Sequence, residues 1–309
     1  MLKNKIKVRS PITVANLGCG FDILGMGLEF AAEELVVIKN SKKKIAISKI
    51  SGAVNLPADP KKNVASVAVQ SMLDKLNINQ GFEIEIKKMI KPGSGLGSSA
   101  ASSAAAVVAV NELLGNPFTR TDLIEFAMNG EKVASGAAHA DNVAPAILGG
   151  ITLIRSNNPL DVIQLPVPKN LYCVILYPHI EIKTKDARGL LKKDVSLKLA
   201  TKQWGNIASL IVGFFKEDYE LISRSIVDYI VEPQRKILIK GFDELKISAI
   251  NAGALGCSIS GSGPSVFALC DGLDVSKRVL SAMKKQYSKE GILFTTYSSK
   301  ISLNGVEII

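Results

Sequence analysis

The sequence predicts an α+β protein in which strands and helices are mixed without a regular strand–helix alternation. Residues 81–88 alternate apolar and charged side chains, which is typical of a strand with one face in water. A glycine-rich segment at 93–99 follows, and then an alanine-rich stretch from 100 to 114 that stops at Gly115, as a helix commonly does. Because later strands and helices do not repeat as βαβ units, a doubly wound parallel sheet is disfavoured.

Two domains are predicted, one over residues 1–160 and the other over residues 161–309. In the first, Thr119 followed by Asp122 is typical of the start of a helix, here expected to run to Val133, and residues 151–154 indicate a strand. A turn-rich stretch around Pro159 and Pro166 marks the boundary. The second domain is expected to contain strands at 171–177, at 266–269 and near 293 and 301, and helices around 186–192, 203–215, 218–230 and 275–287.

Composition and charge are those of an ordinary globular chain. Of its 309 residues, 47% are hydrophobic and 21% are charged, and the formal net charge is +10. Most of the positive surplus is lysine scattered along the chain, which favours a solvated surface over a nucleic-acid partner. No apolar stretch is long enough to span a membrane, and four cysteines without a C-x-x-C pair argue against zinc. We expect a cytoplasmic protein with no nucleic-acid and no membrane partner.

The glycine-rich segment 93–99 is a candidate phosphate-binding loop. A turn that enters a helix presents free backbone N–H groups and the positive end of the helix dipole to an anion. Tight turns and close helix packing also require glycine and alanine, so the loop alone is a weak signal. Two common phosphate loops are excluded: no lysine follows Gly97, as a P-loop requires, and the glycines do not follow the G-x-G-x-x-G pattern of dinucleotide-binding folds.

Three segments together resemble motifs of the GHMP kinases, a family that includes galactokinases, homoserine kinases and mevalonate kinases. Residues 90–101 (IKPGSGLGSSAA) are similar to the family's ATP-binding motif. Residues 10–22 (SPITVANLGCGFD) resemble its first motif in the homoserine kinase form, although Cys19 stands where proline is common. Residues 253–265 (GALGCSISGSGPS) resemble its third motif, so the resemblance covers most of the chain.

The resemblance implies a two-domain GHMP kinase fold, with a ribosomal protein S5 domain 2-like N-terminal half and a ferredoxin-like C-terminal half. It implies that ATP and Mg²⁺ are used to phosphorylate the side-chain hydroxyl of L-homoserine, a step of threonine biosynthesis. The third motif is expected to pack beside the glycine loop and to close the nucleotide site between the domains. A homodimer is one candidate for the oligomeric state, which the sequence leaves open.

The resemblance also implies roles for individual residues. ATP is expected to contact Lys91, Pro92, Gly93, Ser94, Gly95, Leu96, Gly97, Ser98, Ser99, Ala100 and Ala101, with Asn63 near the adenine and Lys87 at the phosphates. Mg²⁺ is expected to be held by Ser98 and Glu131. The substrate is expected to contact Asn16, Asp22, His139, Thr184, Arg188 and Arg235.

The charges of homoserine explain the expected substrate-binding residues. Homoserine is a zwitterion, so its site needs an anion for the ammonium group and a cation for the carboxylate. Asp22 with Asn16 is expected at the ammonium group, and Arg188 with Arg235 at the carboxylate. Plain alternatives stay open for each of them: an aspartate that caps a turn, arginines that lie on the surface, and a histidine at 139 that belongs to the core.

The catalytic residues that the resemblance implies are Asp141, Asn142 and Arg188. Mevalonate-type relatives use an aspartate base near this aspartate–asparagine pair, whereas homoserine kinases are thought to rely on alignment and electrostatics. The sequence leaves open which of the two side chains faces the substrate, and we expect no obligate base. A mevalonate-type kinase and a non-catalytic ATP-binding sensor are the alternative functions.

Overall fold

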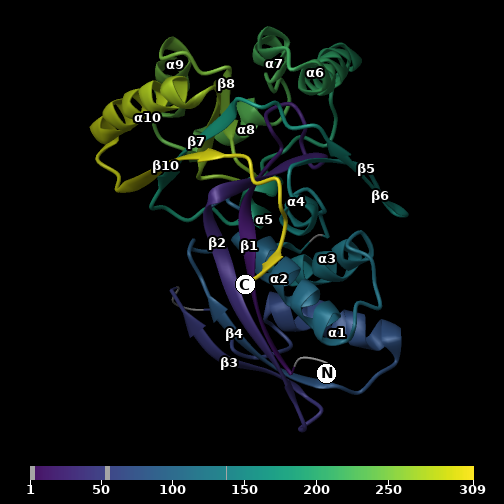
Figure 1. Cartoon of the computed structure of the whole chain (residues 1–309). Helices are drawn as coiled ribbons and strands as arrows, with labels where there is room; N and C mark the ends of the chain where they lie inside the picture. The colour runs from purple at the N-terminus through teal and green to yellow at the C-terminus, as the bar shows by residue number, and fades with distance from the viewer. Residues whose placement is uncertain (1–3, 53–55, 137) are drawn as a thin grey trace.

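The computed structural model of the chain describes residues 4–52, 56–136 and 138–309 (Figure 1). Within these residues the larger of two sheets has seven strands. They are β1 (Lys5–Ala15), β2 (Leu24–Asn40), β3 (Ile45–Ser51), β4 (Gly81–Lys87), β5 (Ile151–Asn157), β6 (Leu160–Leu165) and β11 (Glu307–Ile308). The main order is β11-β1-β2-β4-β3, and β5 pairs with the first residues of β2 and with β6. All of these pairs are antiparallel except β3 with β4.

Helices cover one face of this sheet (Figure 1). They are α1 (Val64–Leu76), α2 (Ser98–Leu113), α3 (Asp122–Ser135) and α4 (Val143–Leu148). Helix α2 is central, because it packs on β1 and β2 and is flanked by the other three. Its residues are mostly alanine, serine and valine, and nearly all of them are buried. A helix that is apolar on every side is stable only inside the protein. The small side chains of α2 allow the sheet and the other helices to pack closely around it.

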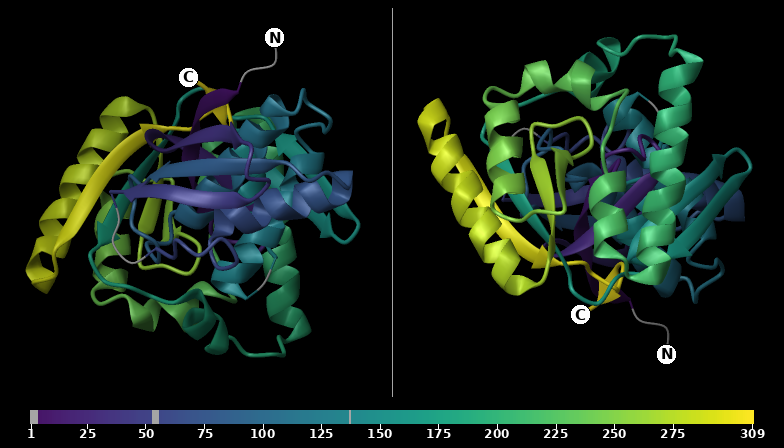
Figure 2. Two further views of the ribbon diagram at one scale, coloured as in Figure 1. Left: turned by 90° about the horizontal axis from the view of Figure 1, so that it is seen from below. Right: turned by 90° about the horizontal axis from the view of Figure 1, so that it is seen from above.

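The second sheet contains β7 (Leu171–Pro178), β8 (Gly256–Ile259), β9 (Val266–Asp271) and β10 (Phe294–Lys300), in the order β10-β7-β9-β8 and all antiparallel. Its helices are α5 (Thr184–Gly189), α6 (Leu197–Lys216), α7 (Tyr219–Ser225), α8 (Glu232–Arg235), α9 (Phe242–Asn251) and α10 (Leu273–Tyr287), with short 3₁₀ turns at Lys236–Leu238 and Ser288–Glu290. Helix α10 lies along this sheet (Figure 2). The chain order of strand, helices, two strands, helix and strand is the ferredoxin-like arrangement that the resemblance implies.

The chain crosses from the first sheet to the second between Leu165 and Leu171. The turn-rich stretch at residues 157–160 is the hairpin turn between β5 and β6, which both belong to the first sheet. The domain boundary at residue 160 therefore stays a prediction, and the change of sheet comes a few residues later. At the other end of the chain, β11 returns to the first sheet and pairs with β1.

Most of the predicted elements are present, but one helix is shorter than expected, and in place of the strands expected near 293 and 301 there is one strand, β10. Thr119 donates from its backbone N–H and its hydroxyl to the Asp122 carboxylate, at 2.9 and 2.6 Å, which confirms the start of α3. The helix expected over 218–230 ends at Ser225. Beyond it, the Asp228 carboxylate accepts the backbone N–H groups of residues 230, 231 and 232, and this local turn competes with a continued helix.

The third motif packs against the glycine loop, as predicted. The Ser260 hydroxyl donates to the Gly95 carbonyl oxygen at 2.6 Å, and the Ser265 backbone N–H donates to the Ser94 carbonyl oxygen at 3.1 Å. These bonds join the loop between β8 and β9 of the second sheet to the glycine loop that precedes α2. Among the described residues, no helix combines the length and the apolar character that a bilayer crossing requires.

Candidate active site

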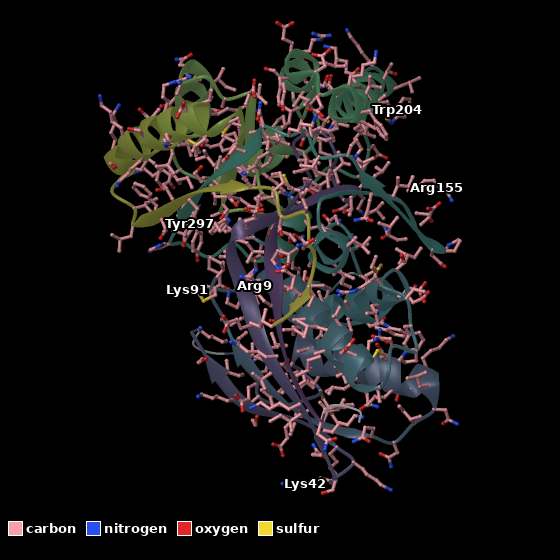
Figure 3. The ribbon with its side chains drawn as sticks, viewed as in Figure 1. Arg9, Lys42, Lys91, Arg155, Trp204 and Tyr297 are labelled. Atoms are coloured by element: carbon pink, nitrogen blue, oxygen red, sulfur yellow. The ribbon has the colours of Figure 1, made fainter. Side chains whose placement is uncertain are left out.

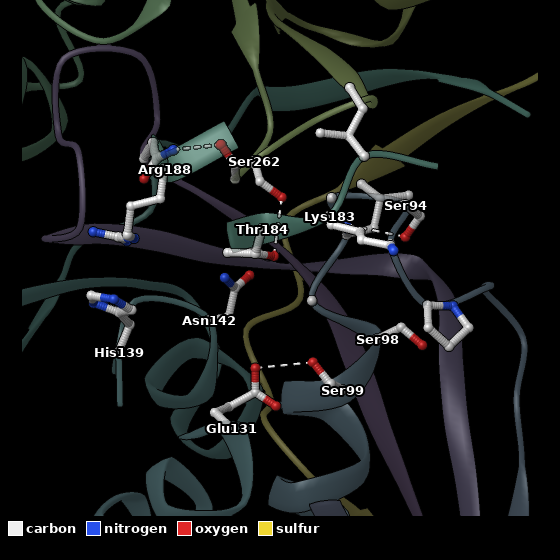
Figure 4. A pocket seen from close by; sticks show the side chains of 18 of the residues that line it. Ser94, Ser98, Ser99, Glu131, His139, Asn142, Lys183, Thr184, Arg188 and Ser262 are labelled. Atoms are coloured by element: carbon white, nitrogen blue, oxygen red, sulfur yellow. Dashed lines mark hydrogen bonds between the residues drawn. The ribbon is translucent and has the colours of Figure 1, made fainter. Parts of the chain in front are cut away.

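A pocket of about 380 Å³ lies where the two halves meet (Figure 4). It is bordered by the β1–β2 loop, the glycine loop, α3, the start of α4, α5 and the third motif. Of the residues predicted from the sequence, the pocket is lined by Asn16, Asp22, Pro92, Gly93, Ser94, Gly95, Leu96, Gly97, Ser98, Ser99, Glu131, His139, Asp141, Asn142, Thr184, Arg188 and Arg235. The predicted nucleotide-binding and substrate-binding residues thus largely share one pocket.

The glycine loop has the backbone geometry of an anion site. Gly93, Gly95 and Gly97 have φ values of 74°, 80° and 58°, in the left-handed region that favours glycine. A Cβ atom on Gly95 would lie 2.6 Å from the carbonyl oxygen of Ser260, so this position also needs glycine for space. Helix α2 starts at Ser98 without a side-chain cap, and its first N–H groups are available to an anion.

The first serine of the helix, Ser98, belongs to a buried network beneath the loop. The Lys88 ammonium donates to the Ser98 carbonyl oxygen at 2.6 Å and to the hydroxyls of Ser98 and Ser102 at 2.8 Å each. The Ser98 hydroxyl in turn donates to the Glu33 carboxylate at 2.9 Å. Glu33 and Lys88 are both buried and form an ion pair of 3.5 Å. The Ser98 hydroxyl is therefore engaged within the protein.

The second serine, Ser99, faces the carboxylate predicted to hold the metal. Its hydroxyl donates to Glu131 Oε2 at 2.9 Å (Figure 4). Burial raises the pKa of Glu131 to about 7, and the Ser99 hydrogen bond and the charge of Lys88 oppose that rise. The hydroxyl beside Glu131 thus belongs to Ser99 and not to Ser98, and the expected role of Ser98 in holding Mg²⁺ stays a prediction. Neighbouring residues of a helix point about 100° apart, so the two hydroxyls meet different partners.

Other expected ATP contacts lie away from the pocket. Lys87 is exposed and forms an ion pair of 3.3 Å with Glu34, because alternate residues of β4 face opposite sides of the sheet. The Asn63 side chain caps α1 by accepting from the Ala65 backbone N–H, and it is buried outside the pocket lining. Lys91 points outward at the edge of the molecule (Figure 3). The expected Ala100 and Ala101 are buried in the first turn of α2 and do not line the pocket.

The other end of the pocket carries opposite charges. The Arg188 guanidinium donates two hydrogen bonds to the Asp22 carboxylate, each of 2.9 Å. Asp22 has φ of 60° in the β1–β2 loop, where its backbone N–H donates to the side-chain oxygen of Asn16. The amide group of Asn16 donates to the carbonyl oxygen of Gly261 in the third motif. Residues of both halves therefore hold this carboxylate in place.

Arg235 is a second, more buried cation at the same end. Its guanidinium donates to the carbonyl oxygens of Ala187 and Gly261, which are uncharged acceptors. Burial lowers the pKa of Arg235 to about 10, and the charge of Arg188 contributes to the same shift. A buried guanidinium near a second guanidinium favours the approach of an anion.

The pocket lining also includes His139, Asp141, Asn142 and Thr184. Burial lowers the pKa of His139, and the two arginines contribute, so the imidazole is neutral at pH 7 although its Nδ1 is 3.7 Å from Asp22. Burial and then the charge of Asp22 raise the pKa of Asp141 to about 7. The Asn142 side-chain oxygen accepts from the Thr13 hydroxyl at 2.7 Å. Both members of the aspartate–asparagine pair line the pocket.

The chain matches two family models and several known proteins. The GHMP kinases N terminal domain model matches residues 63–150, and the GHMP kinases C terminal model matches residues 210–289. A homoserine kinase of Chlorobium phaeovibrioides is 46% identical over 310 positions, which cover 96% of this chain and 97% of the relative. The chain belongs to the homoserine kinase family of the GHMP kinases. Membership in a kinase family implies ATP as a substrate.

Solved structures agree with this membership of the homoserine kinase family. The crystal structure of homoserine kinase from Cytophaga hutchinsonii is 48% identical, with a TM-score of 0.96, and the match covers 100% of this chain and 98% of that one. L. major mevalonate kinase in complex with R-mevalonate is 18% identical, with a TM-score of 0.73, covering 97% of this chain and 98% of that one. The second likeness shows the fold alone.

Two side chains that matter in this homoserine kinase family member were not singled out from its sequence. The Lys88 ammonium donates to the start of α2. The alternation of β4 indicates that Lys88 faces inward, because it follows the inward-facing Ile84 and Ile86 at the same spacing of two residues. Thr13 holds Asn142 from β1, and nothing in the sequence signals that contact, which joins residues 129 positions apart.

Proposed function

We propose that this protein is a homoserine kinase, which transfers the γ-phosphoryl group of ATP to the side-chain hydroxyl of L-homoserine and forms O-phospho-L-homoserine for threonine biosynthesis. One observation carries the proposal. A single pocket has the glycine loop at one end and the Asp22, Arg188 and Arg235 charges at the other. The first end suits a polyphosphate, and the second suits a zwitterionic amino acid.

Phosphoryl transfer mainly requires that donor and acceptor be aligned and that the charge on the phosphates be stabilised. The backbone N–H groups of the glycine loop and the N-terminus of α2 supply fixed dipoles for the triphosphate. The loop is held by the third motif through Gly95 and Ser94, so its geometry is set before the nucleotide arrives. Preorganised donors of this kind need no reorganisation during the reaction.

Mg²⁺ fits the donor set beside the loop. The Glu131 carboxylate and the Ser99 hydroxyl are 2.9 Å apart, and both line the pocket. Mg²⁺ prefers oxygen ligands and commonly takes only one or two carboxylates from the protein, with phosphate oxygens completing its shell. Among the residues that the structure describes, no cluster of three or more His, Cys, Asp or Glu side chains suits a metal held by the protein alone. When bound, Mg²⁺ supplies charge neutralisation at the phosphates.

Homoserine is placed with its ammonium group at Asp22 and its carboxylate at Arg188 and Arg235. Asp22 and Arg188 bond to each other in this structure, so substrate binding replaces part of an existing ion pair with two new ones. Asn16, neutral His139 and Thr184 complete the polar lining around the substrate. This orientation directs the side-chain hydroxyl toward the glycine loop at the opposite end of the pocket.

We assign no obligate base to the reaction. The Oδ1 atom of Asp141 accepts the Asn142 backbone N–H at 3.1 Å, so this oxygen is already engaged within the protein. Asn142, held by Thr13, carries no ionisable group. Alignment by Asn142 and Arg188, together with the dipoles at the phosphates, then carries the transfer.

A cytoplasmic location and the absence of a nucleic-acid or membrane partner belong to this proposal, as does a homodimer as the candidate assembly. Light scattering on the purified protein decides the assembly.

The experiment that tests the function is a substrate panel. Purified protein is incubated with MgATP and, separately, with L-homoserine, mevalonate or shikimate, and ADP release is coupled to NADH oxidation. We expect turnover with homoserine and at least about a hundredfold lower kcat/KM with the other two acceptors. Preference for mevalonate would make the protein a mevalonate-type kinase, and ATP binding without turnover of any acceptor would make it a sensor.

A further inference from the structure

Phe21 connects the two arginines of the substrate site. The guanidinium carbon of Arg188 lies 5.3 Å from the centroid of the Phe21 ring, and that of Arg235 lies 4.9 Å from it. Both distances are within the range of cation–π attraction, which is strongest where the groups are shielded from water. Arg188 and Arg235 come from α5 and α8, and Phe21 comes from the β1–β2 loop in the other half. One ring therefore contacts both cations across the junction of the halves.

Core packing does not explain this ring. Phe21 is half-buried and belongs to none of the hydrophobic clusters formed by the described residues, whereas its loop neighbours Leu17, Cys19 and Ile23 all pack into one. An apolar ring that packs only against the core would be expected in such a cluster. The ring contacts that the structure gives for Phe21 are to guanidinium groups.

The loop that carries Phe21 has a fixed backbone. A Cβ atom on Gly18 would lie 1.9 Å from the carbonyl oxygen of Ile226, and one on Gly20 would lie 2.4 Å from Leu24. Gly18 also has a φ of 72°. The backbone before Phe21 is thus held against its neighbours, and after it the Asp22 backbone N–H donates to the Asn16 side-chain oxygen, so the Cα atom of Phe21 has a defined place.

The repulsion between Arg188 and Arg235 explains why an aromatic ring at Phe21 would stabilise this site. Arg188 is paired with Asp22, but the hydrogen bonds of Arg235 go to two carbonyl oxygens, and the charge of Arg188 contributes to lowering the pKa of Arg235. Two neighbouring guanidinium groups repel each other until an anion lies between them. The electron-rich face of an aromatic ring attracts both and carries no charge that would compete with a carboxylate.

We propose that Phe21 is a positioning residue that sets the relative placement of Arg188 and Arg235 and so determines how tightly they bind the carboxylate of the amino-acid substrate. The inference rests on the proposed function, since it assumes that homoserine is the acceptor. Phe21 itself does not line the pocket, and it acts through the two arginines.

The test compares Phe21→Leu, which removes the ring, with Phe21→Tyr, which keeps it. Initial rates are measured with homoserine and with ATP as the varied substrate. Phe21→Leu should raise KM for homoserine by about fivefold to thirtyfold and leave kcat and KM for ATP within about twofold, and Phe21→Tyr should remain within about threefold of the unmodified protein. Phe215→Leu, on the exposed face of α6, is the matched control that should change none of these values.

A second acceptor distinguishes carboxylate binding from a general disturbance of the pocket. Aminopropanol is homoserine without its carboxylate, and Phe21→Leu should leave its kcat/KM within about twofold of the unmodified protein. The proposal is overturned if Phe21→Leu leaves KM for homoserine unchanged, if it affects aminopropanol as strongly as homoserine, or if Phe21→Tyr behaves like Phe21→Leu. A protein that turns over mevalonate and not homoserine would instead overturn the proposed function, whatever the variants do.

Discussion

Two bonds of 2.9 Å between Asp22 and Arg188 define the substrate end of the pocket, and Arg235 adds a second cation behind them. The arrangement is costly to build without a ligand, because Arg235 is buried among uncharged acceptors. A zwitterion with one anionic and one cationic group complements it. In the proposed function, these few side chains decide which acceptor the enzyme binds.

Removal of either arginine should weaken homoserine binding specifically. In Arg188→Leu and Arg235→Leu, a charge-assisted contact worth about 1.5–3 kcal/mol is lost, so KM for homoserine should rise about tenfold to a hundredfold. KM for ATP should stay within about threefold. Steady-state kinetics with each substrate varied in turn measures both. Arg155→Leu, at an exposed ion pair on β5, is the control. Equal increases for both substrates would mean that the arginines act on the phosphates or on the fold.

The residue that decides the question of a general base is Asp141. If alignment carries the reaction, Asp141→Asn should lower kcat less than tenfold, because the amide has nearly the shape of the carboxylate. A general base contributes about 10²–10⁴ in rate, so its loss would be plain. Glu131→Gln and Asp22→Asn should lower activity more than Asp141→Asn does. A fall in kcat beyond a hundredfold for Asp141→Asn, in protein that binds ATP normally, would contradict the mechanism.

At the scale of single elements, the first turn of α2 has two functions on two sides. Ser98 faces inward and joins Lys88 and Glu33 in a buried network, and Ser99 faces the pocket and Glu131. Burial alone disfavours the charged forms of Lys88 and Glu33, and each group offsets part of that effect for the other. The network holds the helix start against β2 and the residue that follows β4, and in the proposed function the pocket side binds the nucleotide.

The two serines should therefore separate stability from catalysis. Ser98→Ala removes a hydroxyl that Lys88 and Glu33 both use, so the free energy of unfolding in urea should fall by about 1–3 kcal/mol. Ser99→Ala should leave that value within about 0.5 kcal/mol and should raise the Mg²⁺ concentration needed for half-maximal activity. The two alanine variants control for each other. If Ser98→Ala altered the Mg²⁺ requirement and Ser99→Ala did not, the assignment would be reversed.

The sequence predicts these elements from the spacing of apolar residues: every second residue in a strand, and every three to four residues in a helix. The alternation in β4 and the alanine-rich run of α2 give the correct elements, and the glycines between them give the loop. The sequence predicts that Lys87 contacts ATP and that Ser98 holds Mg²⁺, whereas in the structure Lys87 is exposed beside Glu34 and the hydroxyl beside Glu131 is that of Ser99. Two adjacent lysines and two adjacent serines look equivalent in a sequence, and only the packed strand and helix decide which member faces inward.

At the scale of the whole molecule, the pocket exists because two independently patterned halves meet. The motifs predict that the glycine loop and the third motif lie together, and the bonds of Gly95 and Ser94 confirm it. The sequence does not predict the pairing of Asp22 with Arg188, the contacts of Phe21 or the change of sheet after Leu165. Such long-range contacts follow from how the halves dock, which local patterns do not encode.

The stability of the whole protein should depend on pH through Asp141. Its pKa is about 7 in the folded protein, against an ordinary value of 3.8, so the folded state binds more protons between these two values. The contribution of Asp141 to the free energy of unfolding is therefore lost as the pH rises toward 7. This loss amounts to about 2–4 kcal/mol. Urea unfolding from about pH 5 to pH 8 should show a flatter dependence for Asp141→Asn than for the unmodified protein. Parallel curves would mean that Asp141 is not a buried acid.

The central claim is that one pocket binds a zwitterionic amino acid opposite the phosphate loop. It is tested most directly by comparing kcat/KM for L-homoserine with the values for γ-hydroxybutyrate, which lacks the ammonium group, and aminopropanol, which lacks the carboxylate. Each missing charge removes a charge-assisted contact, so each analogue should be phosphorylated at least about tenfold less efficiently than homoserine. An analogue that is phosphorylated as efficiently as homoserine would show that Asp22, or the arginine pair, does not bind the substrate, and would contradict the account.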